Sequence, residues 1–196
     1  MMRLASMKKI AALVAGATLL SGAAVAETVR NDEFRLTFPN WCGGVQKQEQ
    51  KVGTPSGDQL NVVTYKAAAE NGAPCILSYS EFPGVITDPE STMDNGRDEF
   101  LRSLGIPAKI ENQKDVKVNG QPGLSFRFSA DQPRPIFGRT DLVVSGNRLY
   151  HLIFVGFSAE QRTEAESSEF FRSFFVEAPA AAAPRARAQA EATSAE

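Results

Sequence analysis

Catalysis that uses a histidine would depend on a single residue in this chain, because His151 is the only histidine. A Ser-His-Asp or Cys-His arrangement would have to use it as the base. His151 lies in a predicted strand, Arg148 to Phe157, on the face that carries the aliphatic side chains of that strand. A two-residue turn at Gly146-Asn147 would place Leu142 opposite it. We therefore favour a structural histidine, buried or half-buried, over a catalytic one.

The two cysteines, Cys42 and Cys75, are the other reactive side chains. Both follow a predicted export signal, and thiols pair in the oxidising compartments to which such signals lead. We predict one intramolecular disulfide and favour it over two buried free thiols. The bridge would close a loop of about 34 residues and stabilise the fold by at most roughly 4 kcal/mol. Two isolated cysteines and one histidine lack the paired spacing of a zinc site, so we predict no metal.

Four carboxylates lie close together near the end of the chain: Glu160, Glu164, Glu166 and Glu169. Carboxylates bind calcium, but Arg162 and Arg172 interleave with these, and we favour a solvated helix face over a calcium site. The sequence contains no phosphate-binding loop, serine-hydrolase elbow, zinc-protease motif or EF-hand loop. We therefore predict no cofactor and assign no catalytic residue. A hydrolase with paired carboxylates stays open, because carboxylates that meet in space need not be near in sequence.

Two further features are candidates for binding. Trp41 is either an exposed ring that stacks on a ligand or a core residue beside the disulfide, and we favour the core. The loop from Asp131 to Arg139 carries Arg134 between two prolines, which fix φ and remove two backbone donors. Arginines held in this way suit a carboxylate or phosphate, so Arg134 and Arg139 are candidate contacts for an acidic partner. The alternative, which we favour, is an ordinary solvated connection with Arg134 paired to Asp131 or to nothing.

The first 26 residues have the order of a Sec-type secretory signal peptide. Positive side chains precede an apolar run from Ile10 to Leu20, and small residues end at Ala26. The run is too short to span a bilayer, which takes roughly 20 residues. We predict cleavage between Ala26 and Glu27 and no transmembrane segment in the mature form. The protein would then be periplasmic or secreted.

One domain is predicted over residues 27–177, and a disordered tail rich in Ala, Pro and Arg over residues 178–196, which have no large apolar side chain to bury. Without the signal, 18 basic residues stand against 23 acidic ones, a formal net charge of −5. An acidic chain without a basic stripe argues against a nucleic-acid partner.

Hydrophobic periodicity predicts the elements that position these residues. Alternating or β-branched runs predict four strands, at 32–38, 45–52, 59–66 and 75–82. A helix follows, which Asp88 caps and Gly105 ends. Four more strands follow as two hairpins within 110–128 and 136–157. A second helix begins with a capping box at Ser158 and presents three phenylalanines near its end: Phe170, Phe171 and Phe174.

The hairpin around Asn119-Gly120 has two possible registers. A two-residue turn would pair Glu111 with Phe128, whereas a three-residue loop ending in a left-handed Gly120 would pair Ile110 with Phe128. The second register keeps apolar side chains on one face, so we prefer the three-residue loop.

Six segments of this pattern carry a family resemblance: "FRLTFPNW", "TPSGDQLNVVTYKA", "CILSYSEFP", "VNGQPGLSFRFS", "GNRLYHLIFVG" and "FFRSFFV". Together, over about Val29 to Val176, the chain resembles PsbP-like domains, including small exported bacterial members of unknown role. The resemblance implies an α+β fold, an α/β/α sandwich with a central antiparallel sheet packed by helices. Relatives in photosynthetic membranes are accessory subunits that assist a metal cluster, and fold relatives in the nucleus bind a small GTPase. Neither role is tied to particular residues of this chain.

The sequence thus predicts an exported, non-catalytic binding or accessory module of the bacterial envelope. Its partner would be an envelope protein or a small ligand, identified by nothing in the sequence. The alternative is a periplasmic hydrolase without a recognisable motif.

Overall fold

Seven strands form the larger of two antiparallel sheets, in the order β3-β4-β5-β9-β8-β7-β6. The computed structural model describes residues 25–53, 57, 59–131 and 133–177. The strands of this sheet are β3 (Gln46–Gly53), β4 (Gln59–Ala68), β5 (Pro74–Glu81), β6 (Lys109–Val118), β7 (Gln121–Ala130), β8 (Ile136–Ser145) and β9 (Arg148–Gly156). All seven were predicted from their alternation, and they form the predicted central antiparallel sheet.

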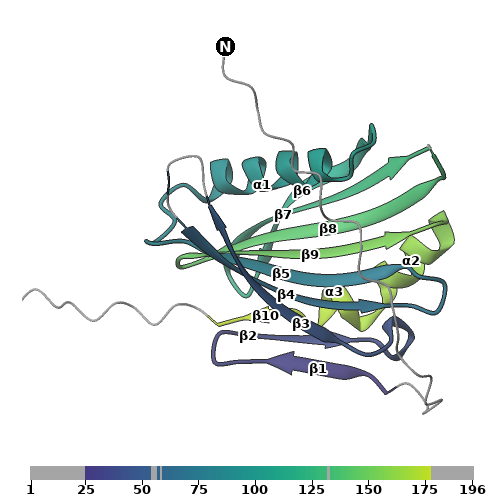
Figure 1. The fold of residues 1–196 in the computed structure, drawn as a ribbon, viewed down its shortest axis with the longest axis horizontal. Helices are drawn as coiled ribbons and strands as arrows, with labels where there is room; N and C mark the ends of the chain where they lie inside the picture. The colour runs from purple at the N-terminus through teal and green to yellow at the C-terminus, as the bar shows by residue number, and fades with distance from the viewer. Residues whose placement is uncertain (1–24, 54–56, 58, 132, 178–196) are drawn as a thin grey trace, which may run out of the picture.

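A three-stranded sheet, in the order β1-β2-β10, packs against one face of the larger sheet (Figure 1). It consists of β1 (Glu27–Arg30), β2 (Phe34–Phe38) and β10 (Phe175–Val176). β2 is the strand predicted at 32–38. β1 and β10 were not predicted, because they have four and two residues and strands so short are ordered by pairing rather than by their own pattern.

Helices cover both faces of the larger sheet, which makes the fold α+β. On one face lies α1 (Pro89–Ser103), which begins as predicted: the Asp88 carboxylate accepts a 3.0 Å hydrogen bond from the backbone N–H of Ser91. The other face carries the small sheet together with α2 (Ala159–Ser167) and α3 (Glu169–Arg172), and Figure 1 shows these layers on opposite sides. A 3-10 turn, η1 (Asn40–Cys42), follows β2.

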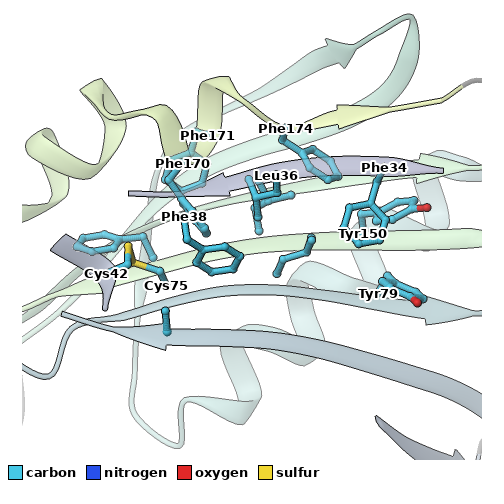
Figure 2. Close-up of a cluster of buried hydrophobic side chains, with 14 of the residues drawn as sticks. Phe34, Leu36, Phe38, Cys42, Cys75, Tyr79, Tyr150, Phe170, Phe171 and Phe174 are labelled. Carbon is cyan, nitrogen blue, oxygen red and sulfur yellow. A yellow bond between two sulfur atoms is a disulfide. The ribbon is translucent and has the colours of Figure 1, made fainter. Parts of the chain in front are cut away.

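Two hydrophobic clusters fill the spaces between these layers. Under α1, Met93 packs with apolar side chains of β7 and β8. Between β2 and the larger sheet, the Phe34 ring makes edge contacts with the rings of Tyr65, Tyr79 and Tyr150, at centroid distances of 5.8 to 5.9 Å. Figure 2 shows this second cluster, to which the phenylalanines of α3 add from above.

The structure has the predicted disulfide, which lies at one end of the second cluster (Figure 2). It joins Cys42 in η1 to Cys75 in β5, and both residues are fully buried. Because η1 follows β2, the bridge ties the small sheet covalently to the larger one.

The predicted turn of the hairpin formed by β6 and β7 was wrong. Its turn has two residues, since Val118 pairs with Gln121 and both Asn119 and Gly120 have positive φ, so the preferred three-residue loop was wrong. Ile110 still pairs with Phe128, as we preferred, because a β-bulge near Asn112 shifts the register by one residue.

The last predicted helix is also corrected, because it is two helices rather than one. Ser168 has an extended backbone (φ −73°, ψ 173°) and separates α2 from α3, and its hydroxyl caps α3 by accepting from the N–H of Phe170. The break turns Phe170 and Phe171 into the core under the small sheet.

The predicted signal peptide, apart from its last two residues, and the predicted tail lie outside the described residues. Within the part that the structure describes, no helix combines the length and apolarity needed to cross a membrane.

Candidate functional site

Polar side chains gather on one face of β6, β7 and β8, beside α2. The apolar residues of β7 turn toward α1, so the residues between them, Ser125, Arg127 and Ser129, point to the opposite face. There the structure has a hollow of ≈ 230 Å³. Its walls include Asn112, Lys114, Ser125, Arg127, Arg139 and Glu166, and we call this hollow the arginine groove.

Arg127 and Glu166 form a two-pronged ion pair between β7 and α2. The guanidinium Nε donates to Glu166 Oε1 at 2.7 Å, and Nη2 donates to Oε2. The hydrogen bond to Glu166 is the main cause that raises the pKa of Arg127 above its already high ordinary value. A bidentate pair of this kind fixes the plane of the guanidinium as well as its position.

Arg139, on β8, is held in a similar way. Its Nε and Nη2 donate to the two carboxylate oxygens of Asp141, at 3.1 and 2.8 Å, and its guanidinium lies 4.2 Å from the centre of the Phe171 ring. Asp141 also accepts a 2.6 Å hydrogen bond from the hydroxyl of Ser125. Since Asp141 is 6% exposed, these bonds satisfy a carboxylate that has little water around it.

A third pair lies at the rim. Glu111 of β6 accepts from the Ser129 hydroxyl at 2.7 Å and from Nη1 of Arg162, on α2, at 3.2 Å. The Ser129 hydrogen bond and the nearby Arg162 charge lower the pKa of Glu111. Arg162 and Glu166 are four residues apart on α2, so they lie on one face of this helix. That face therefore supplies the ion-pair partners of Glu111 and Arg127 on the sheet.

His151 is placed as the sequence predicted. It lies opposite Leu142 and on the α1 face, with its ring 5.0 Å from that of Phe100 and nearly perpendicular to it. Its Nε2 is buried and has no hydrogen-bond partner. Burial lowers the pKa of His151 to about 3, so at neutral pH the ring is uncharged. It lies on the sheet face opposite the arginine groove.

The predicted loop with Arg134 and Arg139 differs from the expectation in three ways. Residues from Ile136 onward belong to β8, so Arg139 lies in a strand rather than in the loop. Asp131 pairs with Lys109, at 3.8 Å, and not with Arg134. The Arg134 guanidinium instead lies 3.6 Å from the centre of the Phe157 ring, a cation–π contact that the sequence pattern did not indicate.

The remaining candidates have mixed outcomes. Glu166 does not belong to a solvated helix face, because its side chain is 12% exposed and paired with Arg127. Among the described residues, no group of three or more His, Cys, Asp or Glu side chains is arranged to hold a metal ion. Trp41 packs edge-on against Phe154 at the border of the core, yet it also lines a wider hollow of ≈ 790 Å³ beside Asn71.

Sequence reasoning missed Lys114 and Arg127 as site residues. A signal was present in "SFRFS", where an arginine alternates with two phenylalanines and must therefore point away from their face. The pairing of Arg127 with Arg139 across β7 and β8 was not readable, because it depends on the register that the 131–135 connection sets.

These layers define an α+β fold, with one central antiparallel sheet between α1 and the opposite layer of small sheet, α2 and α3. No protein-family model and no curated protein matches the chain.

Solved structures give the fold more directly. The solution structure of cyanobacterial PsbP from Synechocystis matches 83% of this chain and 98% of its own, at 16% sequence identity and a TM-score of 0.50. A protein of unknown function from Pseudomonas aeruginosa, described as a putative regulator, matches 79% of this chain and 99% of its own, at 11% identity and a TM-score of 0.40. The first likeness supports the PsbP-like fold and assigns no function.

Proposed function

We propose that this chain is an exported, non-catalytic binding or accessory module of the bacterial envelope, and that the arginine groove is its main binding surface. The observation that carries the proposal is the set of guanidiniums that carboxylates and aromatic rings hold in fixed positions on one face. Arginine keeps its proton at all physiological pH values, so such a surface recognises charge and does not exchange protons.

The position of the only histidine argues against catalysis that uses a histidine as the base. Its ring lies on the far face of the sheet, and its buried Nε2 cannot reach a substrate in the groove. A histidine that acts as a general base needs a ring nitrogen within hydrogen-bond reach of the proton that it removes.

Export is part of the proposal and has two supports. The N-terminal segment has the order of a cleavable signal, and the buried disulfide belongs to the chemistry of an oxidising compartment. Cleavage between Ala26 and Glu27 would leave β1 at the start of the mature chain.

An acidic partner that contacts Arg134 and Arg139 also belongs to the proposal. The two arginines differ in availability, since Arg134 is exposed whereas Arg139 is bonded to Asp141. Replacing Arg139 alone would leave Asp141 without its ion pair, which costs stability. The useful variants are therefore Arg134→Ala, and Arg139→Gln combined with Asp141→Asn.

The test is cross-linking of the mature protein in the native envelope, followed by identification of the captured partner. We expect both variants, the one at Arg134 and the one in the groove, to lose the partner while unfolding as the unaltered protein does. Arg102→Ala is the matched control, because Arg102 is an exposed arginine on α1, on the other face. If the variants capture the partner as well as the unaltered protein does, the assignment of this binding surface is wrong.

A second measurement addresses catalysis. The purified protein is assayed against esterase, glycosidase and peptidase substrates, with no turnover expected. Turnover that co-purifies with the protein and is abolished by neutralising Asp141 or Glu166 would refute a non-catalytic role and favour a hydrolase.

A further inference from the structure

We propose that the arginine groove binds a single oxyanion, the carboxylate or phosphate group of a ligand or partner, through Lys114, Arg127 and Arg139. The inference rests on the proposed function and adds the chemical class of what is bound.

The strongest observation is a pair of like charges placed directly opposite each other. Arg127 on β7 and Arg139 on β8 are cross-strand partners. Like charges in this position destabilise a sheet, so a pair of this kind has a cost that the fold must offset. Here Glu166 and Asp141 offset it, each from one side of its arginine.

The carboxylates leave part of each guanidinium free for a ligand. Arg127 and Arg139 both use Nε and Nη2 for their carboxylates. These two ion pairs, both within the described part of the chain, leave the Nη1 atom of each arginine unused. Since both planes are already fixed, binding an anion at Nη1 costs little further side-chain entropy.

The charge of the lining favours an anion over a cation. Lys114, Arg127 and Arg139 come from three neighbouring strands, and Glu166 is the one carboxylate among the groove's walls. Even when the adjoining Asp141 is included, one positive charge remains in excess. This excess lies within a chain whose formal net charge is −2.

A β-bulge shapes the open side of the groove. Asn112 and Gln113 stand opposite a single residue of β7, and Asn112 has a φ of 51°, which is uncommon for a residue other than glycine. The bulge is fastened to α1 because Nη1 of Arg97 donates to the side-chain oxygen of Gln113 at 3.2 Å. Asn112 is one of the residues that line the groove, and its side chain carries an amide donor.

The size of the groove limits what it holds. Pockets for whole drug-sized ligands have volumes of roughly 300 to 1,000 Å³, and ≈ 230 Å³ is smaller. The groove therefore accepts an end group, with the rest of the ligand or partner outside it.

The experiment titrates the mature protein with inorganic phosphate and, separately, with acetate at constant ionic strength, and follows backbone amide signals by NMR. We expect saturable shifts centred on the amides of Asn112 and Arg127. Shifts with phosphate alone assign a phosphate group, shifts with acetate alone assign a carboxylate, and shifts with both support the shared class. No saturable shift with either anion overturns the proposal.

Two lysines of β6 give a matched pair of variants. Lys114→Gln removes an exposed lysine of the groove and is expected to weaken anion binding about fivefold. Lys117→Gln removes an exposed lysine of the same strand that is not among the groove's walls, and is expected to change binding less than about twofold. Equal weakening by both variants would mean a non-specific charge effect and would overturn the site.

A neutral double variant tests the arginine itself. Arg127→Gln with Glu166→Gln keeps the net charge unchanged and leaves no unpaired buried carboxylate, so its expected loss of anion binding, about tenfold or more, reflects the missing guanidinium. Binding that this variant retains would contradict the proposal. Failure of the anion titration together with intact partner capture would refute the ligand class and leave the proposed function standing. Anion binding without capture of any envelope partner would support the ligand class and refute the proposed function.

Discussion

Protonation of His151 should destabilise the fold, and this is the most direct test of its burial. Burial lowers its pKa to about 3 in the folded protein, whereas an exposed histidine has a pKa of 6.5. The unfolded chain therefore binds a proton more readily than the folded one. The uncharged His151 therefore makes its full contribution to the free energy of unfolding above the unfolded pKa. This contribution is lost as the pH falls through 6.5 toward 3.

The size of the effect follows from the two pKa values. At about pH 5 most unfolded molecules carry the proton on His151 and few folded molecules do, which costs at most about 2 kcal/mol relative to about pH 8. Because His151 is the only histidine, no other side chain has an ordinary pKa between about pH 5 and about pH 8.

The assay compares the unaltered protein with His151→Gln by urea unfolding at both pH values. Trp41, the only tryptophan, packs against Phe154 and reports unfolding by its fluorescence. We expect the free energy of unfolding to fall by about 2 kcal/mol more in the unaltered protein than in the variant. Falls that agree within about 0.5 kcal/mol would mean that water reaches the ring and that the burial argument is wrong.

Four further predictions concern the disulfide, a glycine and the two ends of the chain. Replacing both cysteines by alanine should lower the free energy of unfolding by at most roughly 4 kcal/mol, measured in urea, and an unchanged value would deny the bridge a structural role. Gly138→Ala should cost about 1 to 3 kcal/mol, because its new Cβ would lie 2.2 Å from a ring carbon of Phe128, whereas Gly53→Ala, with open space around its Cβ, should change little. Mass spectrometry of the exported protein should give Glu27 as the first residue, and an intact N-terminal methionine would contradict cleavage. Proteolytic removal of the residues after Ala178 should leave the melting temperature unchanged, and a fall of several degrees would show that they pack.

Local patterns were sufficient for most elements of the larger sheet and for α1. Each depends on neighbours in sequence, such as the Asp88 cap or the alternation of β7, and these act in the same way wherever the segment lies. The same is true of His151, since the turn at Gly146-Asn147 alone set the register that places it opposite Leu142.

Local patterns failed where a distant contact decides the conformation. β10 exists because two residues pair with β2, about 140 positions away. The bulge at Asn112 restored a register that the two-residue turn would have shifted, and no turn rule contains it. The break at Ser168 sends the α3 phenylalanines into a core whose other side comes from β2.

By itself, the sequence determined the period and polarity of each segment, the pairing of the cysteines and the sheltered place of the histidine, because these follow from hydrophobic alternation, turn chemistry and cysteine count. Only the tertiary structure decided that Arg127 and Arg139 stand opposite each other, and that α2 supplies Glu166 to one of them. Ion pairs join side chains that are near in space but far apart in sequence, with 39 positions between Arg127 and Glu166, and no local pattern encodes such a distance.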